Sequence, residues 1–415
     1  MSKIYLVLYN ALVVFALPLI AIAVLFSKKY RKELFYKISE RFACYNFSNL
    51  NSKKKTVWIH CASLGEVRAI EPILDNLKDD YFIVLTTITK SGREYAAKLQ
   101  KADFARLLPL DIYPIMNKAF DIIKPDLIVI VETEFWVSML YAAARKDIKI
   151  ITVNGRMSEK SFGGYKKARF FWRKFVGLIN IVIARSAEDA DRFRCLTEEK
   201  SAILVSGNIK YDRDFTSIAQ RKEILFKESD FVFTAGSTKE NEEAVIADAY
   251  VKAGGNFKVF LAPRHLARIS EVAKLLEDKS IKYSLFSEND FAGEFILVDV
   301  FGKLQNIYSI SDVCYVGGSL VDKGGQNPIE PAAYGKPALF GKYMDNFKTE
   351  AESLLKNGGA FIVKDADDLA SKIKEFMTNG SFLKRTGDNA LKTARDQKGA
   401  VSFTLEKIKE ILDAK

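Results

Sequence analysis

The chain has few of the residues on which common enzyme sites depend. It contains two histidines, His60 and His265, and four cysteines among 415 residues. The cysteines are far apart and form no Cys-x-x-Cys pair, so the sequence implies neither a zinc site nor a disulfide framework. Two histidines also leave few candidates for a Ser-His-Asp triad. We therefore expect an active site without a metal ion and without a bound cofactor.

Two common nucleotide-binding signatures are also missing. The sequence contains no P-loop and no Gly-x-Gly-x-x-Gly fingerprint. Their absence counts against an ATPase and against a dehydrogenase.

The charge is unbalanced, because acidic residues are fewer than basic ones and the net charge is +11. This sign indicates an anionic partner, such as nucleic acid, acidic lipid or a phosphorylated or carboxylated substrate. The chain has no finger or RNP motif, and its lysines and arginines are spread along the sequence rather than gathered in one stripe. We therefore expect no nucleic-acid partner.

The longest apolar run lies at the N-terminus. It extends from Ile4 to Phe26 with Asn10 as its only strongly polar residue, and at about 1.5 Å per residue a helix of this length crosses a bilayer core. A cleaved signal peptide is the alternative, but its apolar region is normally shorter and follows the charge. Here the basic segment 27–32 follows the apolar run, which by the positive-inside rule leaves the body in the cytoplasm. We expect a transmembrane anchor over residues 1–30 and a body that folds without it.

The rest of the chain alternates short apolar runs with longer amphipathic stretches. This βαβ pattern is typical of α/β proteins with helices on both faces of a parallel sheet. Twelve strands in one open sheet are unusual, so we expect two doubly wound, Rossmann-like domains facing a cleft. We assign them to residues 31–210 and 211–395, with a C-terminal helix over 396–415 that packs back on the first domain. The expected strands are 56–62, 81–89, 126–131, 148–153, 179–184, 202–205, 231–235, 257–262, 295–300, 313–316, 337–340 and 360–363.

Polar clusters follow several of these strands, where ligands bind in doubly wound folds. Ser63-Leu64-Gly65-Glu66 follows the first strand and presents a carboxylate where a helix should begin. Ser-x-x-Glu is also the capping-box signature, in which Ser63 and Glu66 only satisfy free N–H groups of that helix. Taken alone, the motif favours the cap.

Two further clusters belong to the first half of the chain. Glu132 and Glu134 follow the strand 126–131 and project from one face if that strand continues. Two acids on an apolar strand are costly unless they are used or paired, so the alternative is a salt-bridge network. Lys210 follows the strand 202–205, where it is either a cleft residue or an ordinary surface lysine.

The second half carries hydrogen-bond donors at its strand ends. Gly236-Ser237-Thr238, Pro263-Arg264-His265 and Gly317-Gly318-Ser319 each follow an apolar run, where backbone N–H groups and an arginine can hold a phosphate. Pro328 suits the first turn of a helix in which Glu330 could accept hydrogen bonds from ribose hydroxyls. We therefore expect the second domain to bind a nucleotide.

Six motifs, taken together, resemble the 3-deoxy-D-manno-octulosonate (Kdo) transferases of lipopolysaccharide assembly. They are His-Cys-Ala-Ser-Leu-Gly-Glu at 60–66, Glu-Thr-Glu-Phe-Trp at 132–136, Asn-Gly-Arg-Met-Ser at 154–158, Gly-Asn-Ile-Lys at 207–210, Pro-Arg-His at 263–265, and Gly-Gly-Ser through Glu at 317–330. Singly they are modest, but their joint order and spacing are specific. The resemblance implies a GT-B fold, CMP-Kdo as donor, a lipid A precursor (a tetraacyl disaccharide bisphosphate) as acceptor, and inversion at the anomeric carbon.

The resemblance also implies roles for individual residues. Glu66 matches the general base, and Lys210 and the Glu132–Glu134 motif match residues that stabilise the transition state, although which glutamate acts stays open. Residues 263–264, 301–303 and 327–330 match the CMP-binding stretches. Together with the strand ends above, the expected donor-binding residues are Ser237, Thr238, Pro263, Arg264, Phe301, Gly302, Lys303, Gly318, Ser319, Asn327, Pro328, Ile329 and Glu330.

The chain departs from the family pattern at two positions. Lys303 stands where the family usually has a glutamate, which puts the side-chain role of this segment in doubt but not its backbone contacts. Gln326 stands where the family usually has a histidine, and an amide cannot titrate near neutral pH, so we expect no proton transfer there.

Two alternatives to a transferase stay open at this point. A GT-B-like sugar-nucleotide epimerase would need no lipid acceptor and hence no anchor, and a membrane-tethered, non-catalytic sugar-nucleotide-binding protein would keep the fold without the activity. The apolar run 4–26 argues against the first, and the presence of Glu66, Lys210 and Arg264 argues against the second. We expect an enzyme at the cytoplasmic face of the inner membrane that contacts the phospholipid surface. The sequence leaves its oligomeric state open.

Overall fold

The computed structural model describes residues 2–25, 35–45, 53–197, 201–212, 231–289 and 291–414. It divides into two compact units, of which unit 1 contains Met1–Arg213 and Lys398–Lys415 and unit 2 contains Asp214–Gln397. The C-terminal helix α19 (Ala400–Asp413) therefore belongs to unit 1, where it packs on α5 (Glu71–Leu77).

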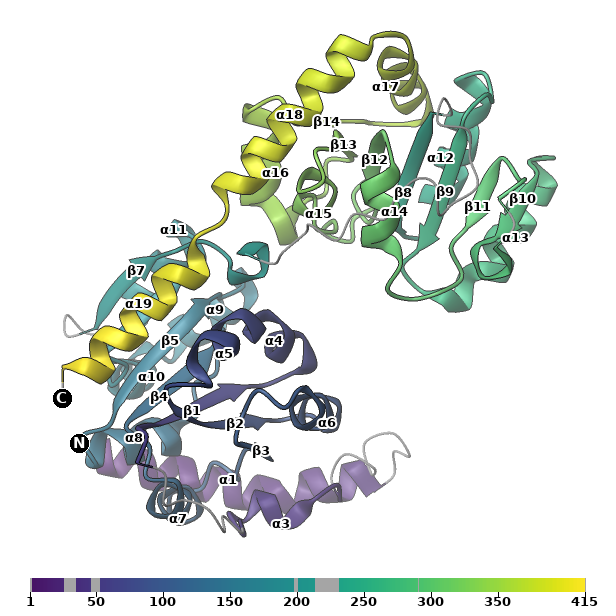
Figure 1. Cartoon of the computed structure of the whole chain (residues 1–415). Coiled ribbons are helices and arrows are strands. Elements are labelled where there is room, and N and C mark those ends of the chain that lie inside the picture. The colour runs from purple at the N-terminus through teal and green to yellow at the C-terminus, as the bar shows by residue number, and fades with distance from the viewer. Residues whose placement is uncertain are drawn as a thin grey trace. The chain divides into compact units, whose positions relative to one another are not determined.

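Unit 1 is built on a parallel sheet of seven strands in the order β3-β2-β1-β4-β5-β6-β7 (Figure 1). The central strands are buried on both faces, which explains why they read as continuous apolar runs. The strands are β1 (Thr56–Cys61), β2 (Phe82–Thr87), β3 (Phe104–Leu107), β4 (Leu127–Val131), β5 (Lys149–Gly155), β6 (Ile181–Ala184) and β7 (Ala202–Val205).

Helices cover both faces of this sheet, and a separate hydrophobic cluster lies on each side. One cluster contains residues of α7, α8, α10 and α11, and the other contains residues of α4, α5 and α19. The remaining helices of unit 1 are α3 (Ile38–Arg41), α4 (Leu64–Ala69), α6 (Lys90–Leu99), α7 (Tyr113–Ile123), α8 (Val137–Arg145), α9 (Glu159–Lys167), α10 (Arg169–Val176), α11 (Ala187–Leu196) and the 3-10 helix η1 (Ile209–Asp212).

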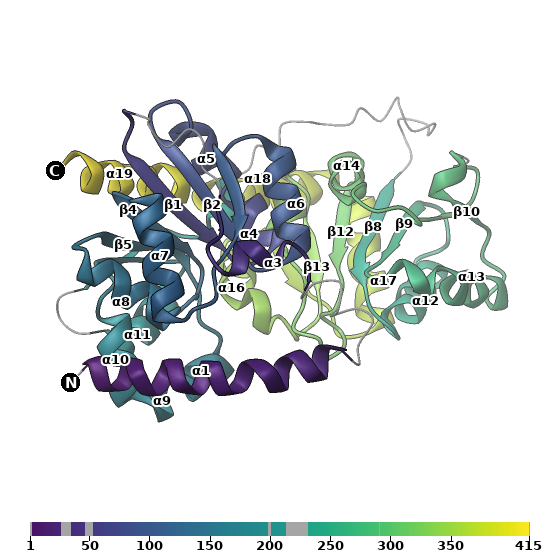
Figure 2. The same ribbon diagram turned by 90° about the horizontal axis from the view of Figure 1, so that it is seen from below.

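The N-terminal apolar run forms helix α1 (Ser2–Leu25), which packs along α8 and α10 of unit 1 (Figure 2). The Tyr9 hydroxyl donates a hydrogen bond to Asp111 at 2.8 Å, and Asn10 Oδ1 accepts the N–H of Tyr113 at 2.6 Å. Leu6 is buried in the core of the unit. The segment is therefore not separate from the body, because α1 bonds to polar groups of unit 1, whereas folding of the body without it stays a prediction.

The predicted transmembrane anchor receives no support from the structure. Among the helices in the described parts of the chain, none combines the length and the apolar character that a membrane crossing requires. The basic segment 27–32 that should follow the anchor lies outside the described residues.

Unit 2 repeats the architecture with a second parallel sheet of seven strands, in the order β10-β11-β9-β8-β12-β13-β14 (Figure 1). Helices α12, α13 and α17 contribute to the hydrophobic cluster on one face, and α14 contributes to the cluster on the other. The strands are β8 (Val232–Thr238), β9 (Lys258–Pro263), β10 (Tyr283–Leu285), β11 (Phe295–Leu297), β12 (Val313–Val316), β13 (Ala338–Phe340) and β14 (Ala360–Ile362).

The helices of unit 2 connect these parallel strands. They are α12 (Glu242–Lys252), η3 (Leu266–Arg268), α13 (Ile269–Asp278), η4 (Phe286–Glu288), α14 (Leu304–Ile310), α15 (Ile329–Ala332), η5 (Asp345–Phe347), α16 (Lys348–Lys356), α17 (Ala366–Thr378) and α18 (Gly380–Asp396). The doubly wound α/β class expected from the sequence is therefore confirmed for both units.

Each sheet has a topological switch point, where strand order reverses. In unit 1 it lies between β1 and β4, and in unit 2 it lies between β8 and β12. Ligands of such folds bind outside the carboxyl ends of the strands at this point. A ligand-binding site is therefore expected in the segments that follow these four strands.

Candidate active site

Glu66 lies in the first turn of α4, directly after β1. Its Oε2 accepts the N–H of Ala62 at 2.6 Å, and its Oε1 accepts the hydroxyl of Ser63 at 3.0 Å. In a capping box the Ser63 hydroxyl would instead accept an N–H group of the helix, and it does not. Ser63 thus serves the carboxylate rather than the helix end, which removes the main argument for a purely structural role.

Glu132 follows β4 and does not continue the strand. Strand β4 ends at Val131, and Glu132 has a φ of +62°, in the left-handed region. The prediction that Glu132 and Glu134 project from one strand face is therefore wrong, because the backbone turns at Glu132. This turn brings Glu132 Oε1 to 2.9 Å from Nζ of Lys210.

Lys210 is held in place through its backbone. It lies in η1, after β7, where its N–H donates to Asn208 Oδ1 at 3.1 Å. The neighbouring N–H of Ile209 donates at 3.2 Å to Oδ1 of Asn154, which is buried at the carboxyl end of β5. The ends of β4, β5 and β7 therefore cooperate to fix one ion pair.

The carboxylates of this cluster influence one another. Burial and the negative charge of Glu132 raise the pKa of Glu66, whereas its bonds to Ala62 and Ser63 and the charge of Lys210 lower it. Burial, with the charges of Glu66 and Glu132, raises the pKa of Glu134 to about 7. One carboxyl group of the cluster therefore keeps a proton well above the ordinary range of a glutamate.

We name Glu66, Glu132, Glu134 and Lys210 the acid cluster. It combines a fixed carboxylate, whose raised pKa makes it a stronger base than a free glutamate, with a cation held by a second carboxylate. This combination can remove a proton from a hydroxyl group while the cation stabilises negative charge. Within the described residues, no group of three or more His, Cys, Asp or Glu side chains is arranged to hold a metal ion.

In unit 2 the expected donor-binding residues lie around the ends of β8, β9 and β12. The N–H of Arg264 donates to the carbonyl of Thr238 at 2.9 Å, which joins the first two of these ends. The side chain of Arg264 is exposed, whereas that of Thr238 is buried and its hydroxyl donates to Glu243 at 2.8 Å. Ser237, the residue before the last one of β8, has a φ of +57°, where the pairing with β9 shifts register.

The glycine turn after β12 does not offer the free phosphate cradle that its sequence suggests. The N–H groups of Gly318 and Ser319 donate to Glu242, at 2.6 and 2.9 Å, and that of Gly317 donates to the carbonyl of Gly236. The Ser319 hydroxyl, which is fully buried, donates to the carbonyl of Val316. This correction has a physical reason, because a carboxylate of the protein already fills the turn.

Two other predicted stretches lie at the surface or near it. Phe301 is 74% exposed, and Gly302 and Lys303 beside it are exposed as well. Asn327 Oδ1 accepts the N–H of Ile329 at 3.1 Å and so starts α15, which carries Glu330. Pro263, Pro328 and Ile329 are buried and support these turns rather than present side chains.

The sequence reasoning missed Lys239 and Glu242, both close to the expected donor site. Lys239 Nζ lies 3.1 Å from Nε2 of His265, and Glu242 is fully buried. The available signal was the pair of acids Glu242 and Glu243 opening a helix just after a strand, the same position that Glu66 occupies in unit 1.

The fold and the strand-end sites define an α/β protein of the GT-B type. A UDP-GlcNAc 2-epimerase from Neisseria meningitidis bound to UDP-GlcNAc superimposes with a TM-score of 0.60 at 11% identity, covering 86% of this chain and 100% of that one. A glycosyltransferase from Rickettsia africae gives 0.60 at 15% identity, covering 87% and 99%. At these identities the likeness shows the fold alone.

The chain belongs to the Kdo transferase family. Residues 36–213 match the family described as 3-deoxy-D-manno-octulosonic-acid transferase. A 3-deoxy-D-manno-octulosonic acid transferase from Aquifex aeolicus is 30% identical, covering 91% of this chain and 99% of its own, and one from Haemophilus influenzae is 29% identical, covering 93% of both. A bifunctional glycosyltransferase/methyltransferase from Fusobacterium nucleatum is 32% identical over 85% of this chain, which spans 57% of that relative's length. The family resemblance is therefore confirmed, and the family is one of glycosyltransferases.

Proposed function

We propose that this enzyme transfers Kdo from CMP-Kdo to a lipid A precursor, with inversion at the anomeric carbon and release of CMP. The observation that carries the proposal is the acid cluster, in which Glu66 is bonded to Ala62 and Ser63 and Lys210 is paired with Glu132, at the switch point of a chain that belongs to this family.

The proposed reaction assigns one step to Glu66. Its carboxylate accepts the proton of an acceptor hydroxyl, the hydroxyl oxygen forms a bond to the anomeric carbon of Kdo, and the bond from that carbon to the phosphate oxygen of CMP breaks. Attack from the face opposite the leaving phosphate inverts the configuration. General base catalysis of this kind contributes about 10²–10⁴-fold to the rate.

We assign Glu132, rather than Glu134, the task of orienting Lys210. The support for this choice is the 2.9 Å ion pair, in which the side chain of Lys210 is 43% exposed and that of Glu132 is 22% exposed. Glu134, whose pKa is raised to about 7, is instead the carboxyl group that carries a proton near neutral pH. Lys210 then faces the negative charge of the reacting groups.

We propose that unit 2 binds the donor. The exposed guanidinium of Arg264 suits the phosphate of CMP, and the exposed ring of Phe301 suits stacking with a base. Asn327 and Glu330 are candidates for the ribose hydroxyls, since Glu330 opens α15 from the first turn. CMP leaves with a single phosphate, so this binding requires less positive charge than a diphosphate leaving group would.

We propose that α1 holds the enzyme on the cytoplasmic face of the inner membrane. One side of the helix docks on unit 1, while Ile4, Val7 and Leu8 on the other side are 60–66% exposed. The exposed ring of Phe170, on α10, lies 6.3 Å from that of Tyr5 and extends the apolar surface, and α9 and α10 also carry exposed lysines. Apolar side chains beside basic ones suit an anionic phospholipid surface.

The direct test is to incubate the purified protein with CMP-Kdo generated in situ and a tetraacyl lipid A precursor, and to determine the mass of the lipid product. We expect a mass increase of one or more Kdo residues and a matching release of CMP. An unchanged lipid, with CMP-Kdo consumed only by hydrolysis, would contradict the proposal. Recovery of an epimerised sugar nucleotide would favour the epimerase that shares the fold.

A further inference from the structure

The first turn of α12 carries two buried carboxylates, Glu242 and Glu243, which are 0% and 1% exposed. Acidic residues in a first turn commonly serve only to complement the helix dipole. These two do more, because both accept hydrogen bonds from groups outside the helix. The donors lie near or after the ends of β8, β9 and β12, and β8 and β12 flank the switch point of unit 2.

Glu242 accepts five hydrogen bonds. The donors are Tyr315 OH at 2.7 Å and the backbone N–H groups of Lys239 at 2.8 Å, Gly318 at 2.6 Å, Ser319 at 2.9 Å and Leu320 at 3.0 Å. Successive N–H groups that converge on one point form a nest for an anion. Here the anion is part of the protein, so this nest is filled before any ligand arrives.

The glycines let the loop after β12 pass close to the end of β8, which places its N–H groups on Glu242. A Cβ on Gly317 would lie 2.4 Å from the carbonyl oxygen of Ser237, and Gly318 has a φ of +71°. Both positions therefore require glycine for steric reasons. The glycine turn is explained by its wrapping around Glu242, and it need not contact a phosphate.

Glu242 also fixes Lys239. Its Oε2 accepts the N–H groups of both Lys239 and Gly318, so the end of β8 and the end of β12 meet at one oxygen. The Lys239 side chain is half-buried, and its Nζ lies 3.1 Å from Nε2 of His265, the residue after Arg264. Lys239, Arg264 and His265 are thus neighbours at adjoining strand ends, and their side chains can donate to a phosphate.

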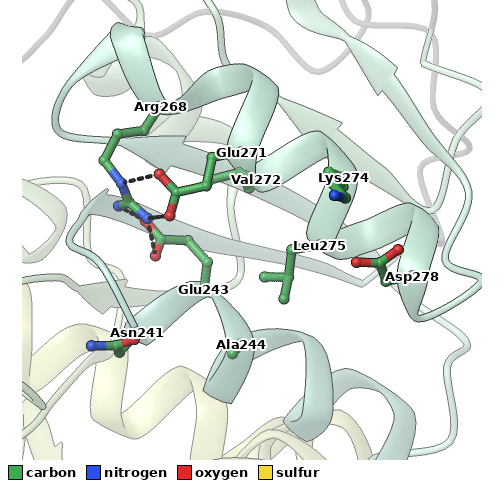
Figure 3. Close-up of a pocket in the computed structure, with 9 residues that line it drawn as sticks. All are labelled: Asn241, Glu243, Ala244, Arg268, Glu271, Val272, Lys274, Leu275 and Asp278. Carbon is green, nitrogen blue, oxygen red and sulfur yellow. Dashed lines mark hydrogen bonds and ion pairs between the residues drawn. The ribbon is translucent and has the colours of Figure 1, made fainter.

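Glu243 is bonded to Arg268, which lies in η3 just after the Arg264–His265 segment (Figure 3). Its Oε1 accepts the Thr238 hydroxyl and Nη1 of Arg268, both at 2.8 Å, and Arg268 also donates to Glu271 at 2.9 Å. Glu243, Arg268 and Glu271 line a pocket of about 230 Å³ between α12 and α13. The guanidinium of Arg268 is already bonded to two carboxylates of the protein there.

We propose that Glu242 is a positioning residue of the donor site, which holds Lys239 where its ammonium group binds the phosphate of the donor beside Arg264. Glu242 touches no substrate and acts through the backbone of Lys239. The inference rests on the proposed function, since the donor is taken to be a cytidine monophosphate sugar.

The test measures binding of CMP to the full chain by calorimetry for E242Q, K239M and the double variant. Glutamine keeps the size of Glu242 but turns an N–H₂ group toward donors that need an acceptor. We expect E242Q and K239M each to weaken CMP binding by about 10-fold to 30-fold, and the double variant to be no weaker than about the stronger single effect. Additive losses would show that Glu242 does not act through Lys239 and would overturn the proposal.

D312N is the matched control. Asp312 also accepts a backbone N–H, that of Val232 at 2.8 Å. This bond lies at the amino ends of β8 and β12, whereas Glu242 lies at their carboxyl ends. We expect D312N to lower the melting temperature without changing CMP affinity. Wild-type affinity in E242Q, or an equal loss in D312N, would overturn the proposal.

Two further measurements keep the result decisive. K239M does not disturb the buried carboxylate, so unchanged affinity in this variant overturns the proposal even if E242Q fails to fold. R264A separates the inference from the proposed function. If R264A weakens CMP binding while K239M does not, only the inference fails, whereas no CMP binding by the unaltered chain would remove the proposed donor itself.

Discussion

The two units carry a glutamate at the same position of the same fold, and the two glutamates differ in their hydrogen bonds. Glu66 follows β1 and Glu242 follows β8, the first strand of each unit along the chain. Each glutamate lies in the first turn of the next helix, beside the switch point of its sheet. Glu66 accepts bonds from Ala62 and Ser63, whereas Glu242 accepts five. Glu66 is 9% exposed and Glu242 is fully buried.

This difference agrees with the roles proposed for the two residues, a base for Glu66 and a positioning residue for Glu242. A carboxylate that accepts several N–H groups holds the loops that carry those donors together. Glu66 has fewer donors and a second carboxylate nearby, and its pKa is raised. Position in the fold therefore does not assign a role, but the number of donors around each oxygen does.

The largest expected effect is that of Glu66→Gln. We expect transfer to fall by about 10²-fold or more, because glutamine keeps the shape of the side chain but accepts no proton. Melting temperature and CMP affinity should stay near those of the unaltered protein. The assay is initial-rate transfer to a lipid A precursor, with calorimetry for CMP.

Glu71→Gln is the matched control for this variant. Glu71 lies in the first turn of the next helix, α5, and accepts the Tyr95 hydroxyl at 2.7 Å. Its substitution should leave transfer unchanged. Near wild-type transfer by the Glu66 variant would remove Glu66 from the mechanism and would make it as structural as Glu242.

The next effect in size concerns the cation of unit 2. Arg264→Ala should weaken CMP binding by about 30-fold, or about 2 kcal/mol, because a charge-assisted bond to the phosphate is lost. Titration of CMP checks the value. Arg385, which is exposed on α18, provides the control, and Arg385→Ala should leave CMP affinity unchanged. Equal affinities of the Arg264 variant and the unaltered protein would move the donor site elsewhere.

The sequence predicted the inner strands and one edge strand of each sheet, β7 and β14, but missed the other edge strand. All twelve expected runs correspond to strands of the structure, and the inner ones are recognisable because parallel strands buried on both faces read as continuous apolar segments. The two strands that were missed, β3 and β10, both lie at sheet edges. β3 contains Arg106 and β10 has three residues, so neither has the length and apolar content that mark a buried strand.

The candidate site was predictable in its residue types but not in its hydrogen bonds. Because Glu66, Glu132 and Lys210 each follow a predicted strand, the sequence placed them together at the carboxyl ends of one sheet. The left-handed turn at Glu132, which forms its ion pair with Lys210, leaves no signal in the residue type. The same limit explains the misread glycine turn, since Gly318 signals an anion nest without showing that Glu242 is the anion.

Asp111 extends the comparison to a buried carboxylate of unit 1 that is held as Glu242 is. It accepts the N–H groups of Ser138 and Met139 and the hydroxyl of Tyr9, although burial raises its pKa to about 6. Tyr9→Phe removes one donor and should lower the free energy of unfolding by about 1.5–3 kcal/mol, since the bond is made to a charged group. Urea denaturation measures the change.

Tyr5→Phe is the control for this variant. Tyr5 keeps its ring contact with Phe171, at 6.0 Å, and within the described parts of the chain its hydroxyl makes no hydrogen bond. A loss in Tyr9→Phe no larger than that in Tyr5→Phe would show that α1 does not stabilise unit 1 through Asp111.

The smallest expected effect sharpens the comparison within the acid cluster, because it identifies the carboxyl group that holds a proton. The pKa of Glu134 is about 7 in the folded protein and ordinary, near 4.5, in the unfolded chain. Between these values the folded state binds more protons, so this contribution to stability is fully present below pH 4.5 and is lost as the pH rises through about 7. Glu134→Gln should therefore remove about 1 kcal/mol of the decline in unfolding free energy between pH 6 and 7, measured by urea denaturation at each pH. Glu240, which is exposed, serves as the control, and Glu240→Gln should keep the decline. Parallel curves for Glu134→Gln and the unaltered protein would mean that Glu134 is ionised like an ordinary glutamate.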